Sequence, residues 1–186
     1  MILYINACVR ECSRTRRLAE RLLSRQDGPV EELRLWEVAF PVADEAFLSE
    51  RDRLIAAAEF EHPLFDMARR FAAADQIVIA APYWDLSFPA ALKQYFEQIN
   101  VVGVTFRYTP EGFPEGLCRA RRLFYVTTAG GPILSDVLGF GYVEALAKGF
   151  YHIPEVLYVK AENLDIENAD VEGILRDAEA GIDRLV

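Results

Sequence analysis

Apolar residues recur along the chain in two patterns that alternate with each other. Short apolar runs rich in β-branched residues are typical of strands in a parallel sheet. Between the runs lie longer segments with apolar residues at i, i+3, i+4 and i+7, which is the spacing of one helical face. The expected strands cover residues 2–5, 77–81, 122–128 and 155–161, together with 30–35, which alternates well enough for a further strand. This alternation predicts a single α/β domain over residues 1–186, built on a doubly wound parallel sheet of five strands.

The segment after the third expected strand shows how a helix is recognised in this chain. Pro89 stands at the first helical position, where its missing N–H costs nothing. One helical face then carries Leu92, Tyr95, Phe96 and Ile99. Other helices are expected over 16–24, 63–72, 143–150 and 171–185, with a short helical patch at 51–60 inside an irregular excursion over 36–62. Glycine and proline punctuate residues 101–117, which predicts a short hairpin arm before the fourth strand.

Composition and charge narrow the classes of function. The chain has 186 residues and a net charge of −9, with 52% hydrophobic residues. Nucleic acids and anionic membranes bind basic faces, so we expect neither as a partner. No apolar run approaches the roughly 20 residues of a membrane span, and the charged residues after the apolar start do not fit a signal peptide. Three cysteines, an odd number, fit a reducing compartment, so we expect a cytoplasmic protein.

The first loop that follows a strand, residues 6–15, is a candidate phosphate site. Ser13 and Thr15 stand where the next helix begins, and Arg14 lies between them. Hydroxyl groups and the free N–H groups of a first helical turn bind phosphate, and an arginine adds charge. The simpler alternative is that Ser13 or Thr15 only caps the helix. The chain has neither GxGxxG nor a Walker sequence, which argues against a nicotinamide Rossmann domain and a nucleoside triphosphatase.

Two further loops follow the third and fourth strands. The first of them offers aromatic rings, backbone amides and one carboxylate: Pro82, Tyr83, Trp84, Asp85 and Leu86. Its aromatic residues either pack on helices or face, in part, a cleft or a partner chain. The other loop contains Thr128, Gly130 and Gly131, whose glycines allow a close backbone approach to a ligand or simply form a turn. Because the carboxyl ends of parallel strands share one edge, we expect the three loops to hold one ligand there.

The cysteines and histidines give no catalytic or metal constellation. The spacing of Cys8 and Cys12 is compatible with a metal or redox pair, but no second cysteine or histidine cluster completes a site. We expect Cys118 to be inert. His62 and His152 lie far apart in sequence and suggest surface or capping roles rather than a catalytic triad. We therefore expect no metal site and no catalytic side chain.

Several of these motifs resemble one family, the flavodoxin-like FMN-dependent NAD(P)H oxidoreductases, and in particular its azoreductase and quinone-reductase branch. The most specific likeness is GVTFRYT at 103–109, followed by Gly112 and by EGL at 115–117. Further motifs are similar to the family at 13–15 (SRT), 80–83 (AAPY), 92–96 (LKQYF) and 128–131 (TAGG). The chain departs from the family at Asp85, where asparagine is usual, and at Asn6, where serine is common. It is also shorter after the second strand.

The resemblance implies a flavodoxin-like three-layer αβα sandwich that binds FMN. The FMN phosphate would rest on Ser13, Arg14 and Thr15, and the isoalloxazine ring would lie against residues 82–86. Gly130 and Gly131 would approach the pyrimidine side of the ring, and Thr128 completes the implied cofactor set. The resemblance also implies a homodimer with the flavin near the interface.

The implied activity is a ping-pong transfer of two electrons from NADH or NADPH, through bound FMN, to a flat aromatic acceptor such as a quinone, an azo or a nitro compound. No side chain need act as an acid or base. The implied substrate walls are Tyr83, Trp84, Phe106 and Tyr108. Two alternatives stay open: a flavodoxin-type electron carrier that binds FMN without small-molecule turnover, and a flavin-free binding or regulatory protein on the same fold.

Overall fold

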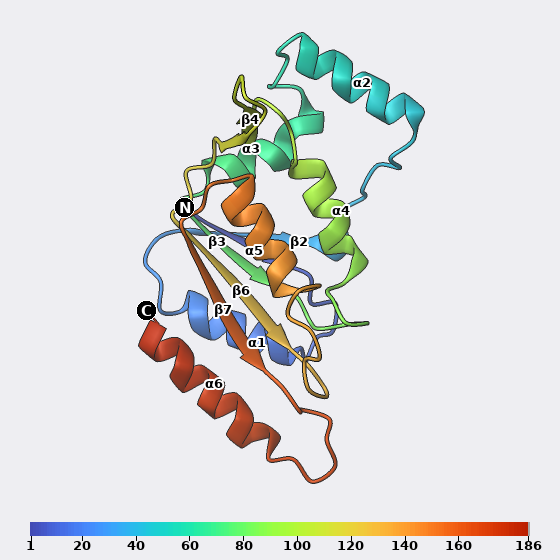
Figure 1. Cartoon of the computed structure of the whole chain (residues 1–186). Helices are drawn as coiled ribbons and strands as arrows, with labels where there is room; N and C mark the ends of the chain where they lie inside the picture. Colours follow the sequence, from blue (N-terminus) through green and yellow to red (C-terminus); the bar gives the residue numbers. More distant parts are fainter. Residues whose placement is uncertain (186) are drawn as a thin grey trace.

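The computed structural model describes residues 1–185, and its centre is a five-stranded sheet (Figure 1). The strands are β1 (Ile2–Asn6), β2 (Val30–Arg34), β3 (Gln76–Ala80), β6 (Arg122–Thr128) and β7 (Glu155–Ala161). They lie in the order β2-β1-β3-β6-β7, and every neighbouring pair is parallel. This confirms the doubly wound sheet expected from the sequence. The order changes direction between β1 and β3, the place where ligands bind in such sheets.

Helices cover both faces of the sheet and complete three layers. One layer holds α1 (Arg14–Leu23) and α6 (Val171–Leu185), and the other holds α3 (Asp66–Ala73), α4 (Ala90–Ile99) and α5 (Phe140–Gly149). Successive residues of β1 enter opposite cores: Tyr4 packs with the α1–α6 layer, and Leu3 and Ile5 with the other. Burial on both faces is why β1, β3 and β6 read as apolar runs, whereas the edge strand β2 is partly exposed and alternates. No helix in the described part of the chain is long and apolar enough to cross a membrane.

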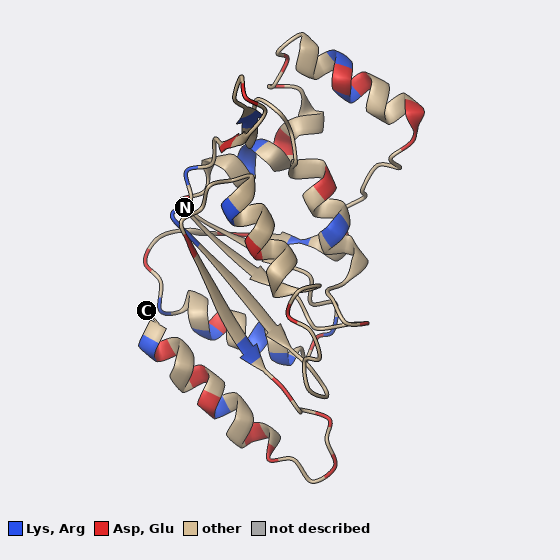
Figure 2. Ribbon diagram, viewed as in Figure 1, with Lys and Arg blue, Asp and Glu red and all other residues tan. Residues whose placement is uncertain are grey.

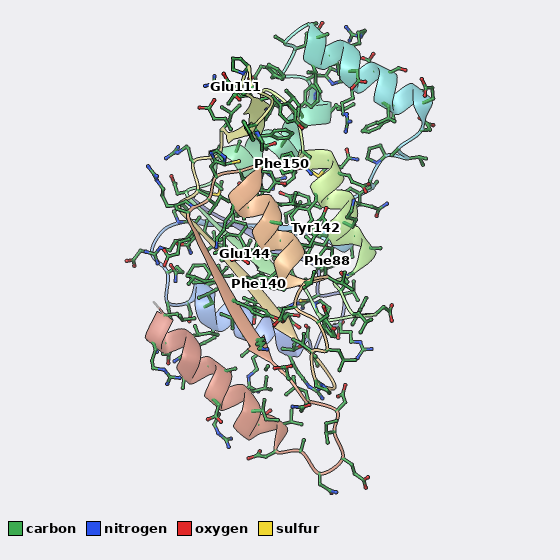
Figure 3. The ribbon with its side chains drawn as sticks, in the orientation of Figure 1. Phe88, Glu111, Phe140, Tyr142, Glu144 and Phe150 are labelled. Atoms are coloured by element: carbon green, nitrogen blue, oxygen red, sulfur yellow. The ribbon has the colours of Figure 1, made fainter. Side chains whose placement is uncertain are left out.

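An aromatic cluster between α4 and α5 supports the loop after β3. The ring centroid of Phe88, just before α4, lies 6.1 Å from that of Phe96 and 5.7 Å from that of Tyr142. The rings of Phe96 and Tyr142 are 5.8 Å apart, so all three pack together. Figure 3 shows Phe88 and Tyr142 in the space between the two helices. This packing fixes the end of the loop that begins at Pro82.

The expected hairpin arm consists of β4 (Phe106–Tyr108) and β5 (Pro114–Gly116), which are antiparallel. Its base is tied to α4 by the buried Thr105, whose Oγ1 donates a 2.7 Å hydrogen bond to the carbonyl of Ile99. Its other end lies against the backbone of Tyr151, where a Cβ atom on Gly116 would overlap the carbonyl group. The GVTFRYT and EGL motifs therefore anchor the arm to the rest of the fold.

Some helix boundaries differ from the expected ones, because capping residues lie outside the apolar pattern. α1 begins at Arg14 rather than at residue 16, since Ser13 caps it. α2 (Glu45–Ala56) replaces the patch expected at 51–60: Asp44 accepts a hydrogen bond from the N–H of Phe47 and starts the helix early. Within α2 Leu54 alone is buried, so the helix has no apolar face to read. Short 3₁₀ helices, η1 (Leu35–Glu37) and η2 (Pro63–Phe65), complete this region.

Candidate functional site

A cavity of about 270 Å³ lies at the carboxyl edge of the sheet, beside the N-terminus of α1. The three loops that the sequence predicted to meet all line it, and the loop after β7 adds a further wall. The expected residues that line the cavity are Ser13, Arg14, Thr15, Pro82, Tyr83, Trp84, Thr128 and Gly130. Asp85, Leu86 and Gly131 are not among its lining residues. The parallel topology thus brings together side chains that are more than 100 positions apart in sequence.

The N-terminus of α1 lines the cavity through Ser13, Arg14 and Thr15. Ser13 is the N-cap, and its Oγ accepts a 3.2 Å hydrogen bond from the N–H of Arg16. The capping interpretation of Ser13 is therefore correct, and it leaves room for a ligand. No described residue accepts a hydrogen bond from the N–H groups of Arg14 and Thr15, and the first turn holds no acidic residue. Two N–H groups at the positive end of the helix are therefore without an acceptor in the described structure.

Thr15 and Thr128 join the first loop to the end of β6. Their hydroxyl oxygens are 2.6 Å apart, a hydrogen bond in which either residue can donate. One hydroxyl hydrogen of the pair remains for a third group, whichever residue donates. Thr15 is buried, and the backbone carbonyl of Thr128 accepts a 3.0 Å hydrogen bond from the N–H of Tyr83. The two threonines therefore sit where all three expected loops meet.

The loop after β3 ends in a tight turn. Trp84 and Ser87 exchange two backbone hydrogen bonds of 3.0 and 2.8 Å, and the residues between them, Asp85 and Leu86, have φ of 49° and 68°. Two left-handed residues in a two-residue connection are the signature of a type I′ turn. The turn points Asp85 and Leu86 away from the cavity into solvent, whereas Trp84 is 39% exposed and lines it. The hydroxyl of Tyr83 is buried, and no described residue pairs with it.

The loop after β7, residues 162–165, is the wall that sequence reasoning missed. Leu164 and Asp165 both line the cavity. Their N–H groups donate to the carbonyls of Ala129 and Gly130 at 3.2 and 2.8 Å, so this loop is joined to the loop after β6. A signal was present: β7 is parallel to the other strands, so its carboxyl end had to reach the same edge.

Gly130 lies close to this neighbouring loop. A Cβ atom on Gly130 would overlap the carboxylate of Asp165, whereas a Cβ atom on Gly131 would meet nothing within 4 Å. The Asp165 carboxylate in turn pairs with Arg14, with 2.7 Å between Oδ1 and Nη1. The cavity mouth is therefore bridged by one ion pair between the α1 N-terminus and the loop after β7.

The positions of Cys8, Cys118 and His62 indicate structural rather than chemical roles. Cys8 and Cys12 both line the cavity, but Cys8 is buried while Cys12 is exposed. Burial raises the pKa of the Cys8 thiol to about 11 and that of the Cys118 thiol to about 12. Both thiols are therefore protonated and unreactive near neutral pH. His62 has the expected capping role, since its Nδ1 accepts a 3.3 Å hydrogen bond from the N–H of Leu64.

The arm does not bring Phe106 and Tyr108 to the cavity. Phe106 is buried, with its ring centroid 4.7 Å from that of Phe150 and 5.5 Å from that of Tyr108. Figure 3 shows Phe150 beside the arm, at the end of α5 away from Phe140. Tyr108 is 53% exposed and is not among the residues that line the cavity. Within one chain, Tyr83 and Trp84 are the expected substrate residues that reach the cavity.

The family model described as a flavodoxin-like fold matches residues 1–185. The chain belongs to this family. The fold agrees in detail: the azoreductase from Bacillus anthracis superposes with a TM-score of 0.84 at 22% identity, over 99% of this chain and 97% of that one. The family recognised from the motifs is thus confirmed, together with its three-layer sandwich.

Two relatives in sequence are both named as FMN-dependent NADH:quinone oxidoreductases. The FMN-dependent NADH:quinone oxidoreductase 2 of Clostridium acetobutylicum is 42% identical over 122 residues, which are 63% of this chain and 60% of that protein. The FMN-dependent NADH:quinone oxidoreductase of Clostridium beijerinckii is 39% identical over 119 residues, or 63% and 59% of the two chains. The match therefore spans about 60% of the length of these curated relatives.

Proposed function

We propose that this chain binds FMN in the cavity and catalyses the reduction of flat aromatic acceptors, such as quinones, azo compounds or nitro compounds, by NADH or NADPH. One observation carries the proposal: a helix N-terminus with two N–H groups that have no described acceptor lines the same cavity as two aromatic side chains, Tyr83 and Trp84. A molecule that carries both a phosphate and a flat ring matches this cavity, with the phosphate at the helix N-terminus and the ring beside the aromatic side chains. The printed names of the two relatives support the same cofactor and the same class of acceptor.

The residues at the α1 end fit a phosphate group. The N–H groups of Arg14 and Thr15, the spare hydroxyl hydrogen of the Thr15–Thr128 pair and the Arg14 guanidinium would all serve as donors. Ser13 would hold the first turn in shape through its cap. Asp165 is the one carboxylate among the described lining residues, and it is already paired with Arg14.

The residues at the other end fit a flavin ring. Pro82, Tyr83 and Trp84 line the cavity there, and the unpaired Tyr83 hydroxyl is a polar group that a ring edge could satisfy. Thr128, whose backbone carbonyl is bonded to the N–H of Tyr83, and Gly130 line the same cavity, and a Cβ atom on Gly131 would meet nothing within 4 Å. Asp85 and Leu86 take part only through the backbone turn that sets the position of Trp84.

When bound, FMN supplies the redox chemistry, taking two electrons from the nicotinamide and giving them to the acceptor. The chain's own residues bind and orient the reactants. The half-exposed face of Trp84 offers a stacking surface for a flat molecule at the cavity mouth. No proton donor or acceptor of the chain is assigned a step, because the Cys8 thiol stays protonated and the lining residues include no histidine or lysine within the described range.

The proposal includes a homodimer that covers the cavity mouth. Large apolar side chains are exposed on two segments next to the cavity: Trp84, Leu86, Leu134, Val137 and Leu138. The Ser87 hydroxyl donates a 2.5 Å hydrogen bond to the Leu138 carbonyl, so the two segments form one surface. Such apolar surface is typical of an interface. Light scattering during gel filtration should give the mass of two chains, and Val137→Glu should shift it to one.

The test of the function combines a spectrum with turnover. Purified protein is mixed with FMN, desalted and examined for the absorbance of bound oxidised flavin. We expect retained flavin, bleaching by NADH, and steady NADH oxidation in the presence of a soluble quinone. A protein that retains no flavin at saturating FMN would overturn the proposal. Flavin that NADH cannot bleach would instead favour an electron carrier.

A further inference from the structure

Asp165 places a negative charge where the proposed function needs a phosphate. Its Oδ1 lies 2.7 Å from Nη1 of Arg14, and both residues line the cavity. Arg14 is the first residue of α1, and no residue within 1–185 accepts a hydrogen bond from the N–H groups of Arg14 and Thr15. A phosphate that contacts Arg14 must therefore share the guanidinium with the carboxylate or displace it.

The backbone around Asp165 is held by hydrogen bonds, so the carboxylate can leave Arg14 only by rotation of the Asp165 side chain. The N–H groups of Leu164 and Asp165 are bonded to the loop after β6 at 3.2 and 2.8 Å. The carboxylate fills the space that a Cβ atom on Gly130 would need. The Asp165 side chain is 69% exposed, so it has room to rotate away from Arg14 toward solvent. The ion pair can therefore open without any movement of the loop.

The other acids of this loop do not duplicate the role of Asp165. Figure 2 shows acidic residues along the connection between β7 and α6. Glu162 is engaged elsewhere: it accepts a 2.6 Å hydrogen bond from the N–H of Ile133 and lies 3.0 Å from the Lys160 ammonium. Glu167 is exposed and does not line the cavity. Among the loop's acids Asp165 alone faces Arg14 in the described structure.

We propose that Asp165 is an internal competitor for Arg14, which lowers the affinity of the site for phosphate-bearing flavin. The inference rests on the proposed function and names the residue that tunes it. On binding, the Arg14–Asp165 pair is exchanged for an Arg14–phosphate pair, and the nearby carboxylate opposes the dianion. A flavin without a phosphate needs no such exchange. Asp165 therefore discriminates by phosphate, and makes FMN easier to release than the helix N-terminus alone would allow.

The test compares FMN with riboflavin in three proteins: wild type, Asp165→Asn and Glu167→Gln. Dissociation constants are measured by quenching of flavin fluorescence at one low ionic strength. Asp165→Asn should bind FMN about three- to tenfold more tightly than wild type and riboflavin with a change below about twofold. Glu167→Gln removes the same charge from the same loop and controls for net charge. It should change both affinities by less than about twofold.

The outcomes separate this inference from the proposed function. If wild type binds FMN and Asp165→Asn binds it equally or more weakly, with unchanged circular dichroism and melting temperature, the competitor role is overturned. Weaker binding would mean that Asp165 holds Arg14 in place for the phosphate. If Glu167→Gln strengthens FMN binding as much as Asp165→Asn, net charge explains the gain and the inference also fails. If wild type binds neither flavin, the proposed function itself fails.

Discussion

Replacing Thr15 by valine tests the phosphate end of the cavity with the least change in shape. Thr15 is 1% exposed, and its Oγ1 lies 2.6 Å from Oγ1 of Thr128. Valine has nearly the volume of threonine but no hydroxyl, so the change is confined to hydrogen bonding. The substitution removes the contact between the two loops and the hydroxyl of the pair that lies on the first turn of α1, where the proposal places the phosphate.

Two free energies follow from this geometry. The lost hydrogen bond to Thr128 is a neutral pair beside an open cavity, so the free energy of unfolding should fall by about 1 kcal/mol. A hydrogen bond to a charged phosphate contributes about 1.5–3 kcal/mol, which corresponds to a roughly tenfold to hundredfold weaker dissociation constant for FMN. Riboflavin has no phosphate, so its affinity should change by less than about twofold.

The assay is a fluorescence titration of FMN and of riboflavin into wild type, Thr15→Val and Thr15→Ser. Serine keeps the hydroxyl and serves as the matched control, so its FMN affinity should stay within about threefold of wild type. Equal losses for FMN and riboflavin would refute the assignment, because Thr15 would then act on the ring or on the fold. An unchanged FMN affinity in Thr15→Val would refute it as well.

Two further predictions concern the arm and the cysteines. Gly116→Ala sets a Cβ atom against the Tyr151 carbonyl and should lower the melting temperature by about 5 °C or more. Gly149→Ala is the control, because its Cβ atom meets nothing within 4 Å and should not lower the melting temperature. Equal melting temperatures for the two variants would contradict the packing of the arm. Burial raises the pKa of the Cys8 thiol to about 11, so at pH 8 a thiol reagent should modify Cys12 and spare Cys8. Mass spectrometry of the peptides checks this, with modification of Cys8 rising only as the pH approaches 11.

The sheet was predictable because each of its core strands is buried on both faces. Leu3 and Tyr4 enter opposite cores, so neither face of β1 needs polar residues and the run reads as apolar. The meeting of the three loops followed from topology alone, since parallel strands end at one edge. The GVTFRYT motif identified the family although its buried Thr105 serves the arm rather than the cavity.

The contacts that could not be predicted are those between side chains far apart in sequence. The pair of Arg14 and Asp165 joins residues 151 positions apart, and no local pattern marks it. Gly130 lines the cavity, but nothing in the sequence marks its close neighbour, the carboxylate of Asp165. Phe106 was interpreted as a substrate wall from its place in the motif, but the ring packs against Phe150. Periodicity reports burial; it does not report which partner a side chain meets.

An anaerobic titration of the reconstituted protein tests directly whether FMN in this cavity passes electrons from NADH to a quinone. The protein is loaded with FMN, desalted, and titrated first with NADH and then with a soluble quinone, while the flavin absorbance is followed. We expect about one equivalent of NADH to remove the absorbance and about one equivalent of quinone to restore it. Flavin that stays bound but does not respond to NADH, or that the quinone fails to restore, would contradict the claim that this cavity passes electrons between the two.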